Sequence, residues 1–201
     1  MKQAVSPPAT PAPAFDGPFT AIDFETADYG ADSACALALV HVVGVEIVGR
    51  DLFMIRPPRL PHPGNSRLVF TYIHGITRKD VCDKPSFADQ WEDIAARLTR
   101  ATFLAAHNAS FDRGVLAACC AAAGVAPPGL HFHCTVQLAR RTWRSRGLER
   151  ANLPTVCEYL GIPLNHHDPA SDAEACARIV IAARREGIAL GQPLKQPKTK
   201  K

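Results

Sequence analysis

The sequence predicts an α/β fold, in which helices cover a mixed β-sheet. Three β-rich segments come first, at about 19–25, 35–47 and 51–56. After residue 86, helical and strand-like patterns alternate, which is the order that such sandwiches show. In addition, acidic residues fall where strands end or helices begin, which is where open α/β sheets bind their ligands.

The length of 201 residues indicates one domain with tails. We expect an Ala/Pro-rich disordered tail at 1–17, a folded domain at 18–187 and a basic disordered tail at 188–201. The net charge of +4 and the pI near 8.7 are compatible with a polyanionic partner but do not identify one.

The cysteine content indicates a reducing compartment. Seven cysteines are an odd number, and none of them forms a C-x-x-C pair. Several lie in apolar segments, so we expect buried thiols rather than disulfides. The chain shows no signal-peptide core and no uninterrupted span of membrane length. These features predict a cytoplasmic protein with no membrane partner.

The first half of the chain predicts three strands. The first runs from about Phe19 to Glu25. The second and third should pair antiparallel across a turn at 48–50. Prolines at 57–63 then predict a long irregular excursion that ends near Thr77.

The second half alternates helices and short strands. Ser86 and Asp89 resemble a capping box, and Asp168 with Pro169 resembles the start of the last helix. The expected helices are 87–99, 111–123, 136–143, 153–160 and 169–185, and the expected strands are 102–106 and 131–136.

Asp23 and Glu25 are the first candidate functional residues. Side chains alternate along a strand, so the two carboxylates point the same way, roughly 7 Å apart. Their repulsion and desolvation are costly unless a cation binds between them. Two ordinary surface acids at a solvated strand end would also explain the pair.

Two further acids begin helices. Asp112 follows a buried strand at the start of a helix, where an acid also simply complements the helix dipole. Asp172 lies in the first turn of the last helix among small and apolar residues, where an unpaired carboxylate is expensive. His167 precedes it by five residues and, taken alone, would be an ordinary loop histidine.

Four stretches together resemble the DEDDh 3′–5′ exonucleases, the family of the DNA polymerase III epsilon subunit and ribonuclease T. They are 22–26 (IDFET), 74–77 (HGIT), 106–112 (AHNASFD) and 166–173 (HHDPASDA). Their order and spacing cover roughly residues 18–186. The resemblance implies a ribonuclease H-like fold with a five-stranded mixed sheet flanked by helices.

The resemblance also implies roles for single residues. The implied ligands of two divalent metal ions are Asp23, Glu25, Asp112 and Asp172. His167 would be the general base. Phe24, Thr26, His74 and Phe111 would lie against the 3′-terminal nucleotide.

The chemistry of these residues, like the resemblance, predicts hydrolysis of a phosphodiester. Four converging carboxylates cannot all stay ionised without cations, and Mg²⁺ or Mn²⁺ suits carboxylate and water ligands. Two such ions can clamp the attacking and leaving oxygens of a phosphodiester, while a histidine takes the proton of the water. We therefore expect hydrolysis of the terminal phosphodiester to 5′-mononucleotides. Stacking of an unpaired base on Phe24 and Phe111 would favour single-stranded 3′ ends, of DNA or of RNA.

Other interpretations remain open. The chain could be a proofreading module that acts with a DNA polymerase or another replication or repair protein, or a non-catalytic nucleic-acid-binding protein. His131, His133 and Cys134 suggest zinc, but their spacing matches no common zinc site and a fourth ligand is missing. The arginines of the loop 140–150 either follow phosphates or form a solvated charged surface.

Overall fold

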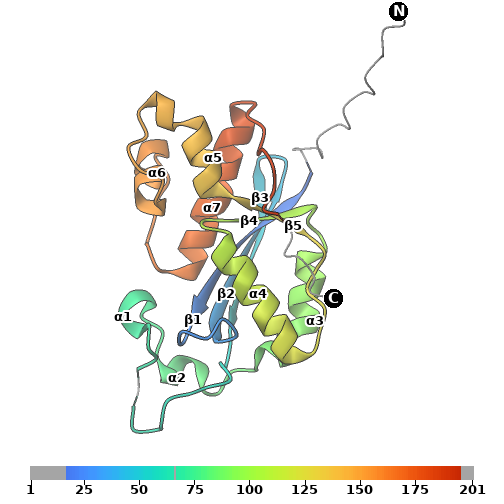
Figure 1. Ribbon diagram of the computed structural model, residues 1–201, viewed down its shortest axis with the longest axis vertical. Helices are drawn as coiled ribbons and strands as arrows, with labels where there is room; N and C mark the ends of the chain where they lie inside the picture. Colours follow the sequence, from blue (N-terminus) through green and yellow to red (C-terminus); the bar gives the residue numbers. More distant parts are fainter. Residues whose placement is uncertain (1–16, 66, 196–201) are drawn as a thin grey trace, which may run out of the picture.

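A five-stranded mixed sheet forms the centre of the computed structural model, which describes residues 17–65 and 67–195 (Figure 1). The strand order is β3-β2-β1-β4-β5. Strand β2 pairs antiparallel with both of its neighbours, whereas β4 and β5 run parallel to β1. The strands are β1 (Phe19–Thr26), β2 (Ala34–Val43), β3 (Glu46–Met54), β4 (Phe103–Ala106) and β5 (His131–Cys134). The predicted fold class is confirmed.

Helices cover both faces of this sheet (Figure 1). One face carries α3 (Phe87–Leu98) and α4 (Ser110–Ala123). The other face carries α5 (Thr135–Thr142), α6 (Leu153–Leu160) and α7 (Pro169–Arg185), with the short 3₁₀ helix η1 (Arg144–Arg146) after α5. The proline-rich excursion contains two single-turn helices, α1 (Thr71–His74) and α2 (Arg78–Val81).

Alternation along β1 decides which side chains face which helices. Phe19 and Ala21 belong to the core beneath α5, α6 and α7. Ile22 and Phe24 belong to the core beneath α3 and α4. Because strand side chains alternate, Asp23 continues the face that looks toward α7.

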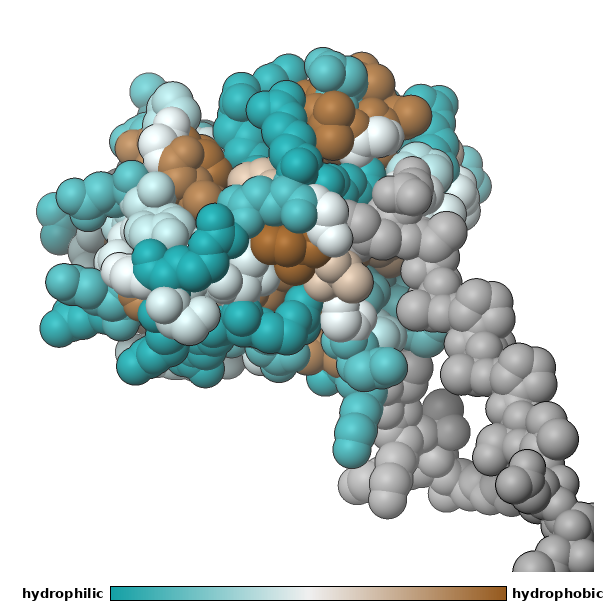
Figure 2. Space-filling model, turned by 90° about the horizontal axis from the view of Figure 1, so that it is seen from above, coloured by the Kyte–Doolittle hydropathy of each residue, from teal (hydrophilic) through white to brown (hydrophobic). Residues whose placement is uncertain are grey.

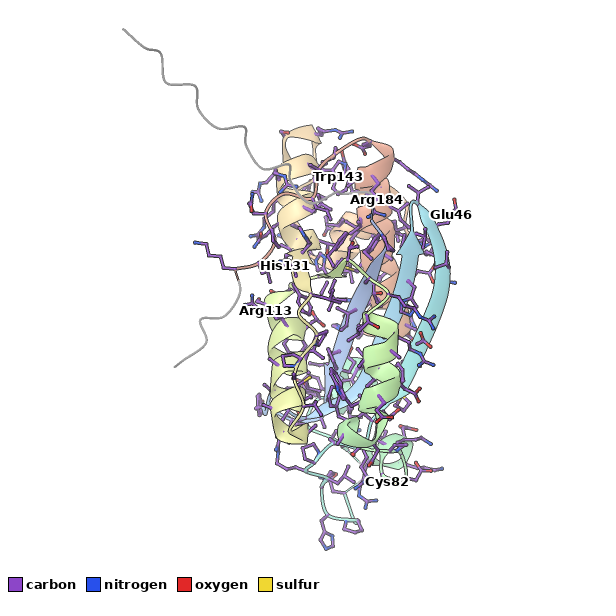
Figure 3. All side chains as sticks on the ribbon, turned by 90° about the vertical axis from the view of Figure 1, so that its right-hand side faces the viewer. Glu46, Cys82, Arg113, His131, Trp143 and Arg184 are labelled. Atoms are coloured by element: carbon purple, nitrogen blue, oxygen red, sulfur yellow. The ribbon has the colours of Figure 1, made fainter. Side chains whose placement is uncertain are left out.

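The carboxyl end of α7 is tied to the start of β1. The Arg184 Nη2 donates a hydrogen bond of 2.6 Å to the carbonyl oxygen of Gly17, and its guanidinium lies 4.7 Å from the centre of the Phe19 ring. Figure 3 shows Arg184 and Trp143 at one end of the molecule and Cys82 at the other. This attachment orients α7 so that its amino end, which carries Asp172, meets the carboxyl half of β1.

The predicted helix signals are confirmed where the structure describes them. Ser86 and Asp89 form a reciprocal capping box at the start of α3. At the start of α7, Asp168 accepts a hydrogen bond of 2.9 Å from the backbone N–H of Ser171, and Pro169 is the first helical residue. These caps satisfy N–H groups that have no partner inside the helix.

The predicted turn at 48–50 is wrong. Strand β3 begins at Glu46 and runs through those residues, and the chain reverses at Gly44, whose φ of +59° suits glycine. Gly49 instead lies opposite His41 in the ladder. A Cβ on Gly49 would come within 3.3 Å of the His41 ring, so this glycine makes room for a neighbour rather than a turn.

The packed chain continues beyond the predicted boundary at residue 187. Ile188 and Leu190 pack against the core beneath α7. The backbone N–H of Leu194 donates a hydrogen bond of 2.8 Å to the carbonyl oxygen of Phe132. These apolar residues bind the segment 188–195 to the domain, so it is not a free tail. The remaining parts of the predicted tails, 1–16 and 196–201, lie outside the described residues.

The surface and the cysteines agree with the composition. Hydrophilic side chains cover most of the face shown in Figure 2, which looks onto the end of the molecule away from α1 and α2. All seven cysteines are described, and all are free thiols. No helix of the described residues has the length and apolar character needed to cross a membrane.

Candidate active site

Four carboxylates from three elements meet at the carboxyl end of β1. Asp23 and Glu25 lie on that strand, Asp112 in the first turn of α4, and Asp172 in the first turn of α7. Asp112 and Asp172 are buried, and the other two are partly exposed. Asp23 and Asp172 are 149 positions apart in the sequence, so the structure brings distant acids together.

A tight connection between β4 and α4 delivers Asp112 to this point. Asn108 has a φ of +67°, which turns the chain directly from the strand into the helix. The Asp112 Oδ1 then accepts a hydrogen bond of 3.0 Å from the backbone N–H of Phe24. The two acids of β1 therefore flank the residue that binds the third.

The electrostatics of this group are unfavourable when it is fully ionised. Burial raises the pKa of Asp23 well above its usual value, and the carboxylates of Asp112 and Glu25 raise it further. Burial and the neighbouring acids raise the pKa of Glu25 to about 8. Burial also raises the pKa of Asp112 to about 7, against the lowering effect of the Phe24 N–H. Among the described residues, no lysine or arginine forms an ion pair with these three acids.

This donor set fits hard divalent cations. Oxygen ligands and negative charge suit Mg²⁺ or Mn²⁺, and a cation would remove the repulsion that raises the pKa values. Within the described chain, no three of the four carboxylates offer oxygens within 4.8 Å of one another. The set is therefore wider than a single closed cage around one ion.

Asp172 is held by the loop that precedes α7. Its Oδ2 lies 3.1 Å from the Nδ1 of His166 and accepts a hydrogen bond of 3.1 Å from the backbone N–H of His167. Burial raises the pKa of Asp172, and both of these contacts oppose that rise. His167 has a φ of +71°, and its exposed ring stacks on that of His166 with 3.8 Å between the centres. The loop therefore places two imidazoles beside the acids.

The four residues predicted to contact the substrate lie in three different places. Phe111 is 46% exposed at the start of α4, next to Asp112. His74 and Thr26 lie together, because the His74 Nε2 donates a hydrogen bond of 3.2 Å to the Thr26 carbonyl oxygen. In contrast, Phe24 is 2% exposed and its ring belongs to the core beneath α4. The expectation that this ring stacks on a base is wrong, because strand alternation turns it away from the acids.

A cavity of about 420 Å³ lies beside the histidines. Its walls come from the end of β3, the loop 73–76 and the segment 165–169, so His74 faces His166 and His167 across it. Burial lowers the pKa of His74, which accepts a hydrogen bond of 3.0 Å from the Ile76 N–H at Nδ1. Both nitrogens of His74 are thus occupied, and its ring is fixed as one wall of the cavity.

The remaining candidates of the sequence lie elsewhere. His133 meets the ring of Phe103 edge-on at 5.0 Å, and His131, His133 and Cys134 form no metal-ligand group among the described residues. In the arginine-rich segment, Arg146 pairs with Glu186, and Arg141 binds the carbonyl oxygen of Ala189.

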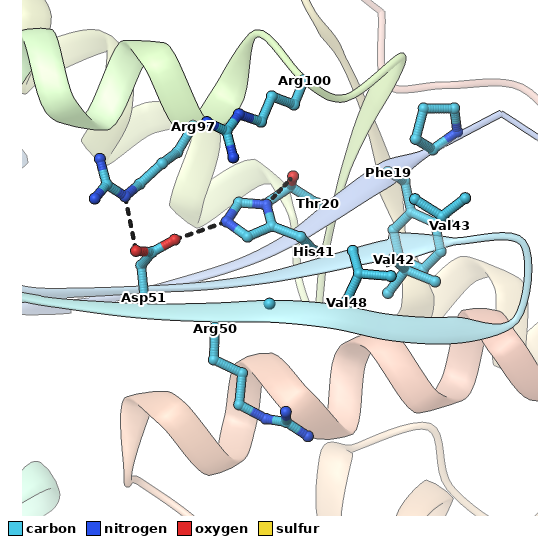
Figure 4. A pocket seen from close by; sticks show the side chains of 12 residues that line it. Phe19, Thr20, His41, Val42, Val43, Val48, Arg50, Asp51, Arg97 and Arg100 are labelled. Carbon is cyan, nitrogen blue, oxygen red and sulfur yellow. Dashed lines mark hydrogen bonds and ion pairs between the residues drawn. The ribbon is translucent and has the colours of Figure 1, made fainter.

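A second cavity, of about 370 Å³, lies near the start of β1 (Figure 4). Thr20 Oγ1 lies 2.9 Å from the His41 Nδ1, and the His41 Nε2 lies 2.8 Å from the Asp51 Oδ2. Arg97 donates a hydrogen bond of 2.7 Å to the other Asp51 oxygen. These four groups satisfy one another, and none of the clustered acids lines this cavity.

Sequence reasoning missed one feature of the site and one feature outside it. His166 received no role, although the His-His dipeptide was a visible signal. The chain of hydrogen bonds from Thr20 to Arg97 was also missed, because it joins residues of four separate elements.

Comparison with known proteins shows what this chain is similar to. The sequence model of the family described as "RNase_T: Exonuclease" matches residues 20–180. Exodeoxyribonuclease 10 of Escherichia coli is 35% identical over 151 residues, which are 72% of this chain and 59% of that protein. The PolC-type DNA polymerase III of Oceanobacillus iheyensis is 32% identical over 164 residues, 80% of this chain but 11% of the polymerase. The chain thus spans less than two thirds of these relatives.

Solved structures share the fold. Exonuclease X in complex with 5′ overhanging duplex DNA is 26% identical with a TM-score of 0.65, and the match covers 87% of this chain and 96% of that one. The nuclease domain of 3′hExo, a DEDDh family member bound to rAMP, is 16% identical with a TM-score of 0.72, covering 92% and 100%.

Proposed function

The chain belongs to the RNase_T exonuclease family, of the DEDDh type, and on that premise we propose that it is a metal-dependent 3′–5′ exonuclease. It hydrolyses the terminal phosphodiester of single-stranded DNA or RNA and releases 5′-mononucleotides. The observation that carries this proposal is the meeting of four mutually repelling carboxylates with His167 at one edge of the sheet.

The carboxylates are the proposed holders of two ions, Mg²⁺ or Mn²⁺. Asp23, Glu25, Asp112 and Asp172 supply only oxygen ligands, and burial raises the pKa of each of them, which supports a bound cation as their missing positive charge. When bound, two such ions supply charge neutralisation at the phosphate and lower the pKa of the attacking water.

His167 is the proposed general base. Its ring is exposed at the rim of the site, while its backbone N–H holds Asp172. A ring nitrogen of His167 therefore can take the proton of a water that approaches the acids. Imidazole is the side chain that most often serves as a general base in enzymes.

Binding of the 3′-terminal nucleotide falls to three of the predicted residues. The exposed ring of Phe111 next to Asp112 offers a face on which an unpaired base stacks. His74 and Thr26, joined by their hydrogen bond, border the same site. Phe24 contributes its backbone N–H, which orients Asp112, rather than its ring.

A role as a proofreading module is the second candidate. One specific observation favours it, namely the match to a segment of PolC-type polymerases that makes up 11% of their length. In that case the chain acts with a DNA polymerase or another replication or repair protein. Co-purification with a polymerase, or a gain of rate when one is added, distinguishes this role from independent action. A purely non-catalytic binder would not need four carboxylates at one point.

The thiols support a cytoplasmic location as part of this proposal. Burial raises the pKa of Cys35 and Cys120 to about 12, so these thiols stay protonated and unreactive. Seven free cysteines without a disulfide fit a reducing compartment, and we place the protein in the cytoplasm.

The test uses 5′-labelled single-stranded DNA and RNA of one sequence. Each is incubated with Mg²⁺, with Mn²⁺ and with EDTA, and the variant Asp23→Asn runs beside the unchanged protein. A ladder that shortens from the 3′ end, and that EDTA and Asp23→Asn both abolish, is the expected result. An oligomer that stays intact in every lane, also after addition of a polymerase, would contradict the proposal.

A further inference from the structure

Three side chains at the rim of the site form a compact group with nitrogen ligands. His166, His167 and Asp172 each offer one ligand atom, and these atoms all lie within 4.8 Å of one another. Among the described residues, this is the one set of three histidine, cysteine or acidic side chains with that spacing. Its composition differs from that of the four carboxylates, because two of its three ligands are imidazoles.

The spacing of this group matches a small tetrahedral metal ion. Zinc binds imidazole nitrogens and carboxylate oxygens at about 2.0–2.2 Å, so two ligands in a tetrahedron lie about 3.3–3.5 Å apart. The His166 Nδ1 lies 3.1 Å and 3.4 Å from the two Asp172 oxygens. This pair is therefore already at a bridging distance, and rotation of the His167 ring would bring the third ligand in.

The group is accessible, and its neighbours leave one position open. Both histidines are exposed and border the cavity of about 420 Å³. His74, on the opposite wall, uses Nε2 for the Thr26 carbonyl oxygen and Nδ1 for the Ile76 N–H. Since His74 has no free nitrogen, the fourth position would be filled by water.

We propose that His166, His167 and Asp172 bind one Zn²⁺ ion and that this ion inhibits the protein. Imidazole ligands suit Zn²⁺, whereas Mg²⁺ prefers carboxylate and water oxygens, so the two ions select different halves of the site. Zn²⁺ bound here coordinates Asp172, which is then not available to the four-carboxylate site. It also coordinates the ring nitrogen of His167, which then cannot accept a proton. The inhibition rests on the exonuclease function proposed above, but the binding of Zn²⁺ does not.

The first test measures binding without any substrate. Protein freed of metal with a chelator is titrated with Co²⁺, whose visible absorption reports nitrogen coordination, and with Zn²⁺ in competition with a chromophoric chelator. We expect the tightest Zn²⁺ site of the unchanged protein to lose at least about tenfold in affinity in His166→Gln. The matched control is His62→Gln, which changes an exposed histidine outside the group and should leave the affinity unchanged.

A second variant separates this site from the carboxylate site. Asp23→Asn removes a carboxylate that is not one of the three ligands, so it should lower Zn²⁺ affinity less than His166→Gln does. A Zn²⁺ affinity that is unchanged in His166→Gln, or that Asp23→Asn lowers more than His166→Gln does, would overturn the proposal. Circular dichroism on each variant confirms that the fold is intact.

The second test measures inhibition at a fixed Mg²⁺ concentration. Zn²⁺ should inhibit the unchanged protein and His62→Gln equally, and His166→Gln should need at least about tenfold more Zn²⁺ for the same inhibition. If no variant degrades nucleic acid but the binding result holds, the proposed function fails and the zinc site stands. If the protein is active and Zn²⁺ inhibits His166→Gln just as strongly, the zinc inference fails and the exonuclease stands.

Discussion

The carboxylate of Asp112 accepts a 3.0 Å hydrogen bond from the backbone N–H of Phe24, the residue between Asp23 and Glu25. This contact joins α4 to β1 across 88 positions of the sequence. It brings Asp112 of α4 beside the two acids of β1, and it orients Asp112 by a backbone group that a side-chain substitution does not remove. The structure therefore separates the charge of Asp112, which serves the chemistry, from its hydrogen bond, which serves the fold.

Asp112→Asn is expected to abolish activity without loss of stability. An amide oxygen can still accept the Phe24 N–H, while the negative charge needed for a cation is gone. We expect the rate of 3′ shortening to fall at least about a hundredfold, because loss of a ligand exceeds the 10- to 100-fold effect of losing an outer partner. The measurements are the exonuclease rate and the melting temperature in EDTA.

Asp112→Ala is the comparison for that experiment. It leaves the Phe24 N–H without a partner and should lower the free energy of unfolding by about 1–3 kcal/mol. Equal stability of the two variants would show that the hydrogen bond contributes nothing, contrary to expectation.

Stability without metal should fall as the pH rises from about 6.5 to 8. The pKa of Glu25 is raised from 4.5 to about 8 in the folded protein. The folded state therefore holds a proton that the unfolded state has released, and this stabilisation is lost as the pH rises through the folded pKa. Burial lowers the pKa of His107 and His133 to about 4, but their stabilising contribution is complete above about pH 6.5 and does not affect this window. The measurement is the melting temperature in EDTA across the window.

A bound metal ion and the substitution Glu25→Gln should both weaken the dependence of the melting temperature on pH. Mg²⁺ or Mn²⁺ should raise the melting temperature more at pH 8 than at pH 6.5, because protons compete with the ion for the carboxylates. Glu25→Gln should reduce the slope in EDTA, whereas Glu92→Gln, on the exposed side of α3, should not. A slope unchanged by Glu25→Gln would contradict the assignment.

His167→Asn is expected to remove the base while keeping the backbone. His167 has a φ of +71°, a conformation that asparagine adopts more readily than other residues with side chains. We expect the rate to fall by about 10²- to 10⁴-fold, with binding of a 3′-ended oligonucleotide retained. The measurements are single-turnover rates and the dissociation constant in Ca²⁺. A loss below fivefold would point to another base, and His62→Asn serves as the control.

The two phenylalanines should respond in opposite ways. Phe111→Ala removes an exposed ring and should weaken binding of a single-stranded end by about 1–3 kcal/mol with little change in melting temperature. Phe24→Ala removes a ring that is 2% exposed and should lower the free energy of unfolding by about 3–5 kcal/mol. Oligonucleotide affinity and thermal melting, measured on both variants, distinguish these effects. Weaker binding in a stable Phe24→Ala protein would restore its predicted role at the base.

Strand alternation is the clearest case in which local sequence was informative. It places Asp23 and Glu25 on one face, and the structure has both toward α7. The same alternation places Phe24 on the opposite face, in the core beneath α4. The role expected for the Phe24 ring came from family resemblance and from the stacking that aromatic rings offer to bases, and the periodicity of the strand argues against it.

Gly49 is a case in which the local sequence led to the wrong prediction. The sequence predicts a turn around Gly49 because glycine often marks one, whereas the turn forms at Gly44. What distinguishes them is the His41 ring on the neighbouring strand, which a Cβ at position 49 would approach within 3.3 Å. A turn and a close approach between strands give the same signal in one sequence.

The sequence by itself determined the fold class, the helix caps and the five residues proposed for catalysis, because alternation, capping and motif spacing are properties of neighbours along the chain. Only the tertiary structure decided that His166 lies against Asp172, that Phe24 points into the core and that the segment 188–195 packs on the domain. Those outcomes depend on which faces of distant elements meet. Burial and pairing between such faces are set by the whole fold, and no local pattern of residues records them.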